Sequence, residues 1–318
     1  MTTTIAARTV EHSWTMMGGT ARVRLVLPGS ASAVSPGPVV DTILALVEAR
    51  AVHLEQRWSR FLADSDLSRL TDAAGRPVTV DGDTVTLLLA MLDGWRETDH
   101  DFDPTLLPAV VAAGYGRSML DPTRSTGLPE SALARADLEA MRIDDCTVTV
   151  PRGTALDPGG IGKGLAADLI AADLLAAGML GCLVEIGGDV RVAGEAPDRV
   201  AWRIAIEDPF AAPSVRGTIR LPDGGVATSS QRKRRWTSDE GIERHHLIDP
   251  ATQRSATSSI QTVTVIAATA ARAEVLTKPG FLRPIDDYLA WIPTRGAAAL
   301  LIDADGVERT TSNWSDYA

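Results

Sequence analysis

Short runs of apolar and β-branched residues, separated by turn residues, fill the second half of the chain and limit its fold most strongly. These runs cover 182–194, 201–208, 217–221, 224–230, 245–249, 261–268 and 297–303. Runs at this spacing, interrupted by single helices rather than alternating with them, are not typical of a regular parallel sheet. The pattern therefore predicts an α+β fold, in which helices pack against a mixed sheet as a sandwich.

Apolar residues at helical spacing mark fewer segments. The clearest covers 39–58, where apolar side chains recur every three or four positions. Further helices are predicted over 84–97, 162–177 and 271–278, the last two ended by glycine or proline. A strand is predicted over 20–27, and loops rich in Gly, Pro, Ser and Thr are predicted over 30–38 and 114–129.

Length, net charge and cysteine count limit the number of domains and the kinds of ligand that the chain can bind. At 318 residues the chain is long enough for one large domain or for two lobes that share a cleft, and we take 1–318 as a single domain. A net charge of −10 disfavours nucleic-acid binding, because a phosphate backbone would be repelled. The two cysteines, Cys146 and Cys182, indicate neither a disulfide framework nor a zinc site.

No segment of the sequence predicts membrane insertion. Residues 1–14 lack the apolar stretch of an export signal, and they hold no cysteine that could carry a lipid. The longest apolar run, 85–92, is far shorter than the roughly 20 residues that a membrane span needs. We therefore expect a cytoplasmic protein without a membrane span.

The stretch 155–175, ALDPGGIGKGLAADLIAADLL, carries the most informative motif. An extended segment ends at Asp157, glycines let the backbone approach a ligand closely, and a helix follows at once. The free N–H groups of a helix start and the ammonium group of Lys163 favour an anion, most naturally phosphate. The spacing fits neither a P-loop nor the GxGxxG dinucleotide fingerprint. The alternative is that Asp157 only caps the helix while the glycines allow tight packing.

This stretch resembles the DLGGIAKGYAVD signature of the ApbE family, the FAD:protein FMN transferases. Other segments are similar to that family's motifs in the same order, namely Met17 to Thr20, Ser59 to Leu70, Asp101 to Thr105, Val184 to Arg191, Ala227 to Ser229, His245 to Thr252, and Thr262 to Lys278. The resemblance covers about 14–281. We interpret no motif in 282–318, which is predicted as a C-terminal strand and tail.

The resemblance implies a two-lobed fold with FAD in the central cleft, and a phosphoryl-type transfer. A Thr or Ser hydroxyl of a target flavoprotein would attack the FMN-side phosphorus of FAD, AMP would leave, and Mg²⁺ would help to neutralise charge. Two alternatives stay open. One is a degenerate FAD-binding protein without transfer, and the other is an FAD pyrophosphatase that releases FMN and AMP.

The resemblance also assigns roles to individual residues. The catalytic candidates are His246, Asp157 and Lys163. The cofactor-binding candidates are Met17, Phe61, Asp101, Phe102, Asp103, Asp157, Lys163, Gly187, Gly188, Asp189, Thr228, Ser229, His246 and Ile248. The metal-binding candidates are Gly160 through its backbone, Glu274, Thr277 and Lys278.

The proposed metal site departs from the family pattern. Glu274 stands where the family has Asp, and Lys278 stands where it has Thr four residues later. Glutamate is still a hard oxygen ligand, whereas a protonated lysine cannot be a ligand. Thr277 is placed to supply the missing hydroxyl. The alternatives are that Lys278 replaces part of the metal charge, or that transfer has been lost.

Two further segments have competing interpretations. His245 and His246 are adjacent, so on a strand only one of them faces a cleft, and we expect His246 to contact phosphate or to assist proton transfer. The basic run 231–236, QRKRRW, is expected to be a solvated loop. Alternatively, one of its arginines guides FAD or an acidic partner into the cleft.

Overall fold

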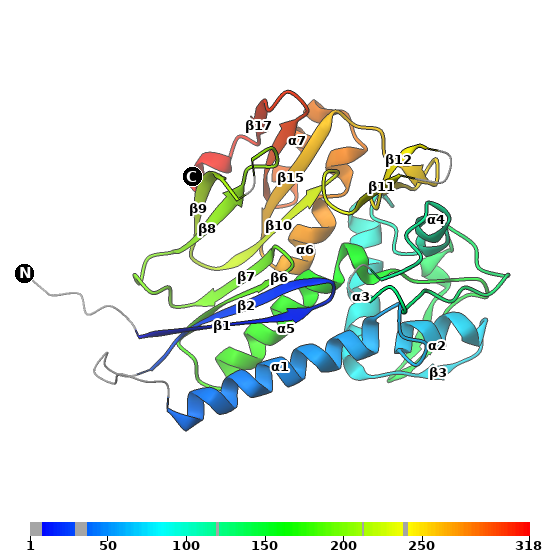
Figure 1. Cartoon of the computed structure of the whole chain (residues 1–318), viewed down its shortest axis with the longest axis horizontal. Helices are drawn as coiled ribbons and strands as arrows, with labels where there is room; N and C mark the ends of the chain where they lie inside the picture. The colour runs from blue at the N-terminus through cyan, green and yellow to red at the C-terminus, as the bar shows by residue number, and fades with distance from the viewer. Residues whose placement is uncertain (1–7, 29–36, 119–120, 212, 238–240) are drawn as a thin grey trace, which may run out of the picture.

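The computed structural model describes residues 8–28, 37–118, 121–211, 213–237 and 241–318. An eight-stranded sheet dominates it, in the order β1-β2-β6-β7-β10-β15-β16-β17, with every neighbouring pair antiparallel (Figure 1). Its strands are β1 Thr9–Met16, β2 Gly19–Val26, β6 Gly181–Ile186, β7 Asp189–Gly194, β10 Gly224–Ser230, β15 Ile260–Ala267, β16 Ala298–Asp303 and β17 Glu308–Thr310. Helices and sheet are mixed as predicted, so the α+β prediction is confirmed.

The remaining elements are helices and short strands. The α-helices are α1 Pro38–Trp58, α2 Asp66–Ala73, α3 Gly82–Glu97, α4 Leu107–Ala112, α5 Gly162–Ala176, α6 Ala270–Leu276 and α7 Ile285–Thr294. The 3₁₀ turns are η1 Leu138–Ala140, η2 Pro158–Gly160, η3 Pro279–Phe281 and η4 Trp314–Asp316. The small sheets contain β3 Val78–Thr79, β4 Arg142–Asp144, β5 Thr147–Thr149, β8 Trp202–Glu207, β9 Val215–Leu221, β11 Arg235–Thr237, β12 Glu243–His245, β13 Ile248–Asp249 and β14 Arg254–Ser255.

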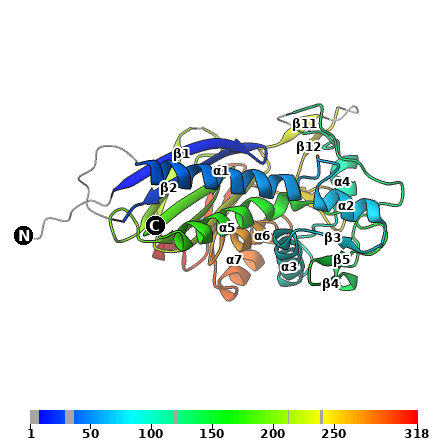
Figure 2. The same cartoon turned by 90° about the horizontal axis from the view of Figure 1, so that it is seen from below.

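The main sheet is buried on both faces. Along β6, Cys182 and Val184 pack into the core that includes α1 and α5, whereas Leu183 between them faces the core that includes the β8–β9 hairpin. This is the period-2 alternation of a strand with two covered faces. Figure 2 shows α1 and α5 running side by side along the sheet.

A smaller group of elements gathers at the end of the molecule away from the N-terminus, where Figure 1 shows α2, α4 and β3. Asp66 ties two of its helices together, because this buried carboxylate accepts hydrogen bonds from Asp81 N and Thr84 Oγ1, both at 2.8 Å. Ser65 caps α2 by accepting from Ser68 N at 3.1 Å. Ser65 and Asp66 thus fix the position of α2 and of the start of α3.

Several sequence predictions need correction. The strand β1 and the helices α2, α4 and α7 were not predicted, and α7 lies in the segment predicted as a strand and tail. The single strand predicted over 245–249 is instead β12 and β13, which a bend at His246 separates. The loop predicted over 30–38 lies almost wholly outside the described residues. In the described part of the chain, no helix has the length and apolarity to span a bilayer.

Candidate functional site

A cleft opens where the end of the main sheet meets the smaller group of elements. Its walls come from the β1–β2 turn, the end of α1, the segment after α3, the start of α5 and the chain around β13. Most of the predicted ligands lie on these walls, and the lining includes Met17, Phe61, Asp101, Phe102, Asp103, Asp157, Gly160, Lys163, Arg234, His246, Ile248 and Lys278.

Two tight hairpin turns lie side by side next to Lys163. Met17-Gly18 connects β1 to β2, and Gly187-Gly188 connects β6 to β7, all four with positive φ as a two-residue type I′ turn requires. A Cβ on Gly19 would lie 3.2 Å from Gly187 Cα, and one on Gly187 would lie 3.1 Å from Lys163 Cδ. The predicted flavin-site motifs at 17–20 and 184–191 therefore meet in space, and Gly187 leaves room for the lysine side chain.

The glycine-rich turn lines the cleft and packs closely against the protein's own side chains, as the tight-packing alternative predicted. Asp157 caps η2 by accepting from Gly159 N at 2.9 Å, so the capping interpretation holds, and Asp157 also lines the cleft. A Cβ on Gly160 would lie 2.8 Å from the Phe102 ring and 3.2 Å from Lys278 Cε. A larger residue here would displace Phe102 or Lys278.

The start of α5 is partly occupied by one of the protein's own anions. Gly164 N donates to Glu274 Oε2 at 2.9 Å. This contact is possible because α5 and α6 touch, and a Cβ on Gly164 would lie 2.4 Å from Ala270 O. Glu274 is thereby fixed at the helix start, where the sequence predicted phosphate.

Lys163 bridges two buried carboxylates. Its ammonium group pairs with both Asp189 and Glu274, which are 3% and 2% exposed. Burial alone would lower the pKa of Lys163, but the two carboxylates raise it above its usual value. Lys163 is thus held charged at the cleft wall, while Asp189 supports it from behind instead of facing a ligand directly.

The two carboxylates differ in their acidity. Burial, together with the nearby charge of Glu274, raises the pKa of Asp189 to about 6. Burial opposes ionisation of Glu274 as well, but Lys163 and Lys278 lower its pKa below the usual value. At neutral pH we expect both to be charged, and Asp189 to be the first of them to take up a proton.

The ammonium group of Lys278 contacts two of the proposed metal ligands, Glu274 and Thr277. The Nζ atom donates to Glu274 O at 2.8 Å, to Thr277 Oγ1 at 3.1 Å and to Ser229 Oγ at 3.2 Å. Burial lowers the pKa of Lys278 to about 8, so the group is mostly protonated at pH 7. Because Glu274 also has each carboxylate oxygen engaged, by Lys163 and by Gly164, this arrangement does not fit a divalent cation.

His246 lies at the bend between β12 and β13 and lines the cleft, whereas His245 is buried and contacts Ala256 O at 3.1 Å. The two histidines therefore face different sides, as predicted. His246 Nδ1 is buried and has no hydrogen-bond partner among the described residues. Burial first, then the positive charges of Arg234 and Lys278, place the pKa of His246 well below its usual value, so the imidazole is neutral at pH 7 and is a weaker base than an ordinary histidine.

Aromatic side chains, among them Phe61 and Tyr115, line the cleft. Tyr115 lies edge-on to Phe61 with ring centroids 6.1 Å apart, and Trp236 lies 5.6 Å from Tyr115. The Arg60 guanidinium group lies 4.3 Å from the centre of the Phe61 ring. Flat rings on one wall of a cleft suit a flat aromatic ligand such as isoalloxazine. Phe61 lines the cleft, and its role as a cofactor-binding residue stays a prediction.

The two aspartates of the 101–105 segment have contacts of their own. Asp101 pairs with Arg283, and Asp103 accepts from Thr105 N at 2.9 Å and from Thr105 Oγ1 at 2.7 Å. Burial raises the pKa of both carboxyl groups. Asp103 therefore orders its turn and also lines the cleft.

Residues on β10 divide between the two faces of the sheet. Ser229 contacts Thr277 Oγ1 at 2.7 Å and accepts from Lys278, which places it behind the cleft wall. Thr228, its neighbour, is exposed and contacts Thr264 Oγ1 at 2.9 Å on the adjacent strand. Neighbours on a strand point to opposite faces, so the Thr228 side chain does not join Ser229 in this cluster.

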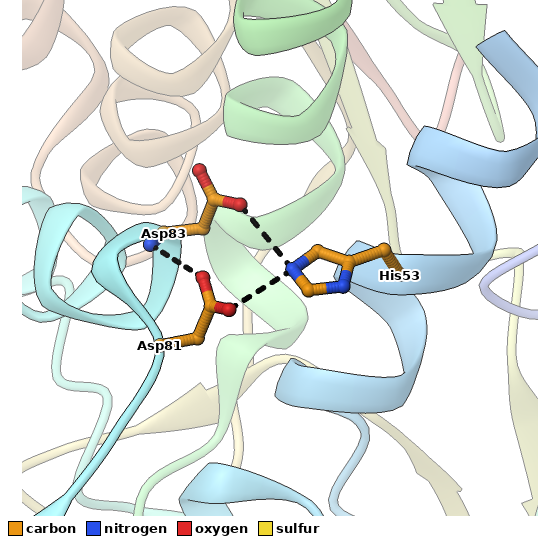
Figure 3. Close-up of side chains that lie close together, drawn as sticks. All are labelled: His53, Asp81 and Asp83. Atoms are coloured by element: carbon orange, nitrogen blue, oxygen red, sulfur yellow. Dashed lines mark hydrogen bonds and ion pairs between the residues drawn. The ribbon is translucent and has the colours of Figure 1, made fainter. Parts of the chain in front are cut away.

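A second group of potential metal ligands lies outside the cleft. Figure 3 shows His53 Nε2 near both Asp81 and Asp83, at 3.2 and 3.6 Å from a carboxylate oxygen of each. Arg50 pairs with Asp83, and Asp81 caps α3 by accepting from Asp83 N at 2.9 Å. These charges are already balanced within the protein, and the cluster serves to dock α3 on α1.

Comparison with known proteins identifies the family. The sequence profile of the ApbE family matches residues 17–301. The chain belongs to the ApbE family. It is 29% identical over 268 residues to the FAD:protein FMN transferase of Vibrio cholerae, covering 82% of this chain and 77% of that protein. It is 26% identical over 305 residues to the enzyme of the same name from Haemophilus influenzae, covering 93% and 86%.

Solved ApbE structures agree with this fold over nearly the whole chain. The ApbE protein of Thermotoga maritima superposes with a TM-score of 0.81 at 26% identity, covering 98% of this chain and 99% of that one. The flavinyl transferase ApbE of Pseudomonas stutzeri superposes with a TM-score of 0.79 at 26% identity, covering 98% of both chains. The resemblance inferred from the motifs is confirmed.

Some cleft residues of this ApbE chain were not assigned by the motifs. Tyr115, which lines the cleft, comes from a segment without a family motif, and its contact with Trp236 forms only in the folded protein. The basic run 231–236 had two interpretations, a solvated loop or the source of an arginine that guides FAD or an acidic partner into the cleft. Arg234 lines the cleft, and its Nη2 lies 3.9 Å from the Cβ that Gly18 would carry. Arg232, Lys233 and Arg235 of the same run are exposed, as expected for a solvated loop, and the guidance of FAD by Arg234 stays a prediction.

Asp168 fixes the start of α6, the helix that carries Glu274 behind the ApbE cleft. Its two carboxylate oxygens accept from Ala270 N and Ala271 N, both at 2.9 Å, and so cap the helix that carries Glu274. We expect Asp168→Ala to lower the free energy of unfolding by about 1–3 kcal/mol, because two buried N–H groups lose their acceptor. Urea denaturation measures this change, with the exposed Asp305→Ala as the control. Equal stability of the two variants would contradict the capping role.

Proposed function

We propose that this chain is an FAD:protein FMN transferase, which moves FMN from FAD to a Thr or Ser hydroxyl of a target flavoprotein and releases AMP. The observation that carries the proposal is the convergence of Lys163, Lys278 and Arg234 on one side of the cleft, beside His246, whose Nδ1 has no partner among the described residues. Three positively charged side chains can pair with the phosphate oxygens of a pyrophosphate. A neutral imidazole can accept the proton that the attacking hydroxyl must lose. The names of the ApbE relatives support the same activity.

The proposed reaction is an in-line displacement at phosphorus. The acceptor oxygen bonds to the phosphorus on the FMN side, the bond from that phosphorus to the bridging oxygen breaks, and AMP leaves with that oxygen. His246 accepts the hydroxyl proton, and Lys163, Lys278 and Arg234 hold the phosphate oxygens and offset their charge. Such a transfer depends chiefly on positioning and charge neutralisation, which this cleft supplies from fixed side chains.

Magnesium, implied as the cofactor by the family resemblance, stays a prediction from the sequence. A bound Mg²⁺ would offset phosphate charge and polarise the reacting oxygen atoms. Gly160, Glu274 and Thr277 stay the predicted ligands, but the contacts of Lys278 with Glu274 and Thr277 do not favour the ion. A cytoplasmic location and a single domain over 1–318 likewise stay predictions.

Product analysis separates the proposed function from its two alternatives. The purified chain is incubated with FAD and a flavoprotein that carries an exposed Thr or Ser acceptor, and the products are weighed by mass spectrometry. FMN on the acceptor, in equal amount to AMP, is the expected result. FMN free in solution would instead indicate a pyrophosphatase, and intact FAD bound to the chain would indicate a binding protein without transfer.

The pH dependence of transfer tests the state of His246. Its lowered pKa keeps the imidazole neutral, so the basic form is fully present at pH values where an ordinary histidine, with a pKa near about 6.5, would be half protonated. We therefore expect kcat/KM for FAD to show no acid limb centred near about 6.5. A His246-dependent limb at that pH would contradict the assignment.

A further inference from the structure

The ammonium group of Lys278 is held by protein oxygens on one side and faces the cleft on the other. Three acceptors lie on one side of its Nζ atom, the Glu274 carbonyl at 2.8 Å and the hydroxyls of Thr277 and Ser229 at 3.1 and 3.2 Å. Thr277 Oγ1 lies only 2.6 Å from Glu274 O and 2.7 Å from Ser229 Oγ, too close for each of the three oxygens to take a separate N–H of a tetrahedral ammonium group, so one N–H is left for a ligand in the cleft. Thr277 is fully buried and Glu274 is 2% exposed, whereas Lys278 lines the cleft. The cation therefore covers these oxygens, and a ligand in the cleft meets the lysine first.

The oxygens beneath Lys278 have little capacity left for a divalent ion. The Thr277 hydroxyl donates to Glu274 O at 2.6 Å, and Glu274 uses one carboxylate oxygen for Gly164 N and the other for Lys163. A metal at this place would need these oxygens at about 2.0–2.1 Å in near-octahedral geometry. It would also lie beside two ammonium groups, which repel it.

The choice of lysine is itself informative in this chain. Of its 31 basic residues only three are lysines, Lys163, Lys233 and Lys278, and two of these three line the cleft. Arginine presents a broad planar fork, whereas lysine is a compact point charge with three donors. A compact cation ringed by hard oxygens is the arrangement that resembles a bound metal ion most closely.

We propose that Lys278 is a built-in cation that takes the place of a divalent metal in binding the pyrophosphate of FAD, so that FAD binding by this chain does not depend on Mg²⁺. This inference rests on the FAD-binding part of the proposed function. Lys278 neutralises phosphate charge from the position that the sequence had assigned to a metal ligand, and it acts together with Lys163 and Arg234.

FAD affinity with and without metal tests the inference directly. The dissociation constant of FAD is measured by fluorescence for the wild-type chain in excess EDTA and in excess MgCl₂, with no acceptor protein present. We expect the two values to agree within about 2-fold, against the tenfold difference that about 1.4 kcal/mol of metal binding energy would produce. Affinity at least tenfold higher in MgCl₂ would overturn the inference and leave the proposed function intact. If FAD binds in neither solution, both fail.

The variant Lys278→Thr tests the exchange of lysine for metal. In EDTA we expect it to bind FAD about 10–100-fold more weakly than wild type, because one charge-assisted contact is lost, and to regain affinity when MgCl₂ is added. The matched control is Lys233→Thr, since Lys233 is an exposed lysine that pairs with Glu207 at 2.7 Å. Its FAD affinity should equal that of wild type in both solutions.

Paramagnetic Mn²⁺ provides a readout that does not depend on FAD affinity. Mn²⁺ is titrated into wild-type chain saturated with FAD, and the free ion is followed by electron paramagnetic resonance. We expect no stoichiometric binding to wild type and one bound ion in Lys278→Thr. One tightly bound Mn²⁺ in the wild-type complex would overturn the inference even if the variant fails to fold.

Discussion

Replacing Lys163 by methionine is expected to lower the free energy of unfolding by about 3–5 kcal/mol and to remove measurable FAD binding. The substitution leaves Asp189 and Glu274 buried without the ammonium group that pairs with both of them. It also exposes an incoming pyrophosphate to two negative charges. Urea denaturation and FAD titration measure the two effects separately.

A matched variant separates the stability effect from the binding effect. In the Lys163→Met background, Asp189→Asn and Glu274→Gln remove the uncompensated charges, and the introduced glutamine would still accept from Gly164 N through its amide oxygen. We expect this triple variant to regain most of the lost stability but not the FAD affinity. Wild-type stability and wild-type FAD affinity in Lys163→Met alone would contradict the role given to this lysine.

The substitution His246→Asn is expected to slow FMN transfer by about 10²–10⁴-fold and to change FAD affinity by less than about 3-fold. Asparagine keeps a polar side chain in the cleft but cannot take the acceptor proton. The measurement is single-turnover transfer at saturating FAD, followed by mass spectrometry of the acceptor. His53→Asn is the matched control, because His53 lies outside the cleft beside Asp81. An unchanged transfer rate, or an equal loss of FAD affinity, would show that His246 is not the proton acceptor.

The sequence predicted those parts of the fold whose pattern is local. The helix over 39–58 and the helix after Gly162 appear within one or two residues of their predicted bounds, because helical periodicity and a terminal glycine mark them. The alternation along 261–268 likewise marked a strand, whereas the single run predicted over 182–194 folds as two strands, β6 and β7, joined by a turn at Gly187-Gly188. These features depend on neighbours in the sequence, which a single chain displays.

Elements with weak local patterns were missed for physical reasons. In the strand β1, exposed polar residues alternate with half-buried residues such as His12 and Trp14. The sequence of this segment alone did not predict a strand, and the strand forms by pairing with β2. The helix α2 has only eight residues, and α7 contains Pro293, which sequence patterns treat as a helix breaker. Tertiary packing, which local propensity does not record, stabilises these elements.

The candidate site was predictable as a set of motifs but not as an arrangement of charges. The motifs named Lys163, Asp189 and Glu274 from three separate segments, yet nothing in their spacing shows that one ammonium group pairs with both carboxylates. The same holds for Lys278, which the sequence marked as a departure without showing which atoms it contacts. Partners 26 and 111 residues apart are joined by the hairpin turns and by the close contact of α5 with α6.

A crystal structure of the chain soaked with FAD tests the central claim most directly, namely that a pyrophosphate binds beside the glycine turn. The account predicts phosphate oxygens within about 2.7–3.2 Å of the ammonium groups of Lys163 and Lys278, and the isoalloxazine ring against Phe61. FAD bound elsewhere on the surface, with side chains packed into the cleft, would contradict it.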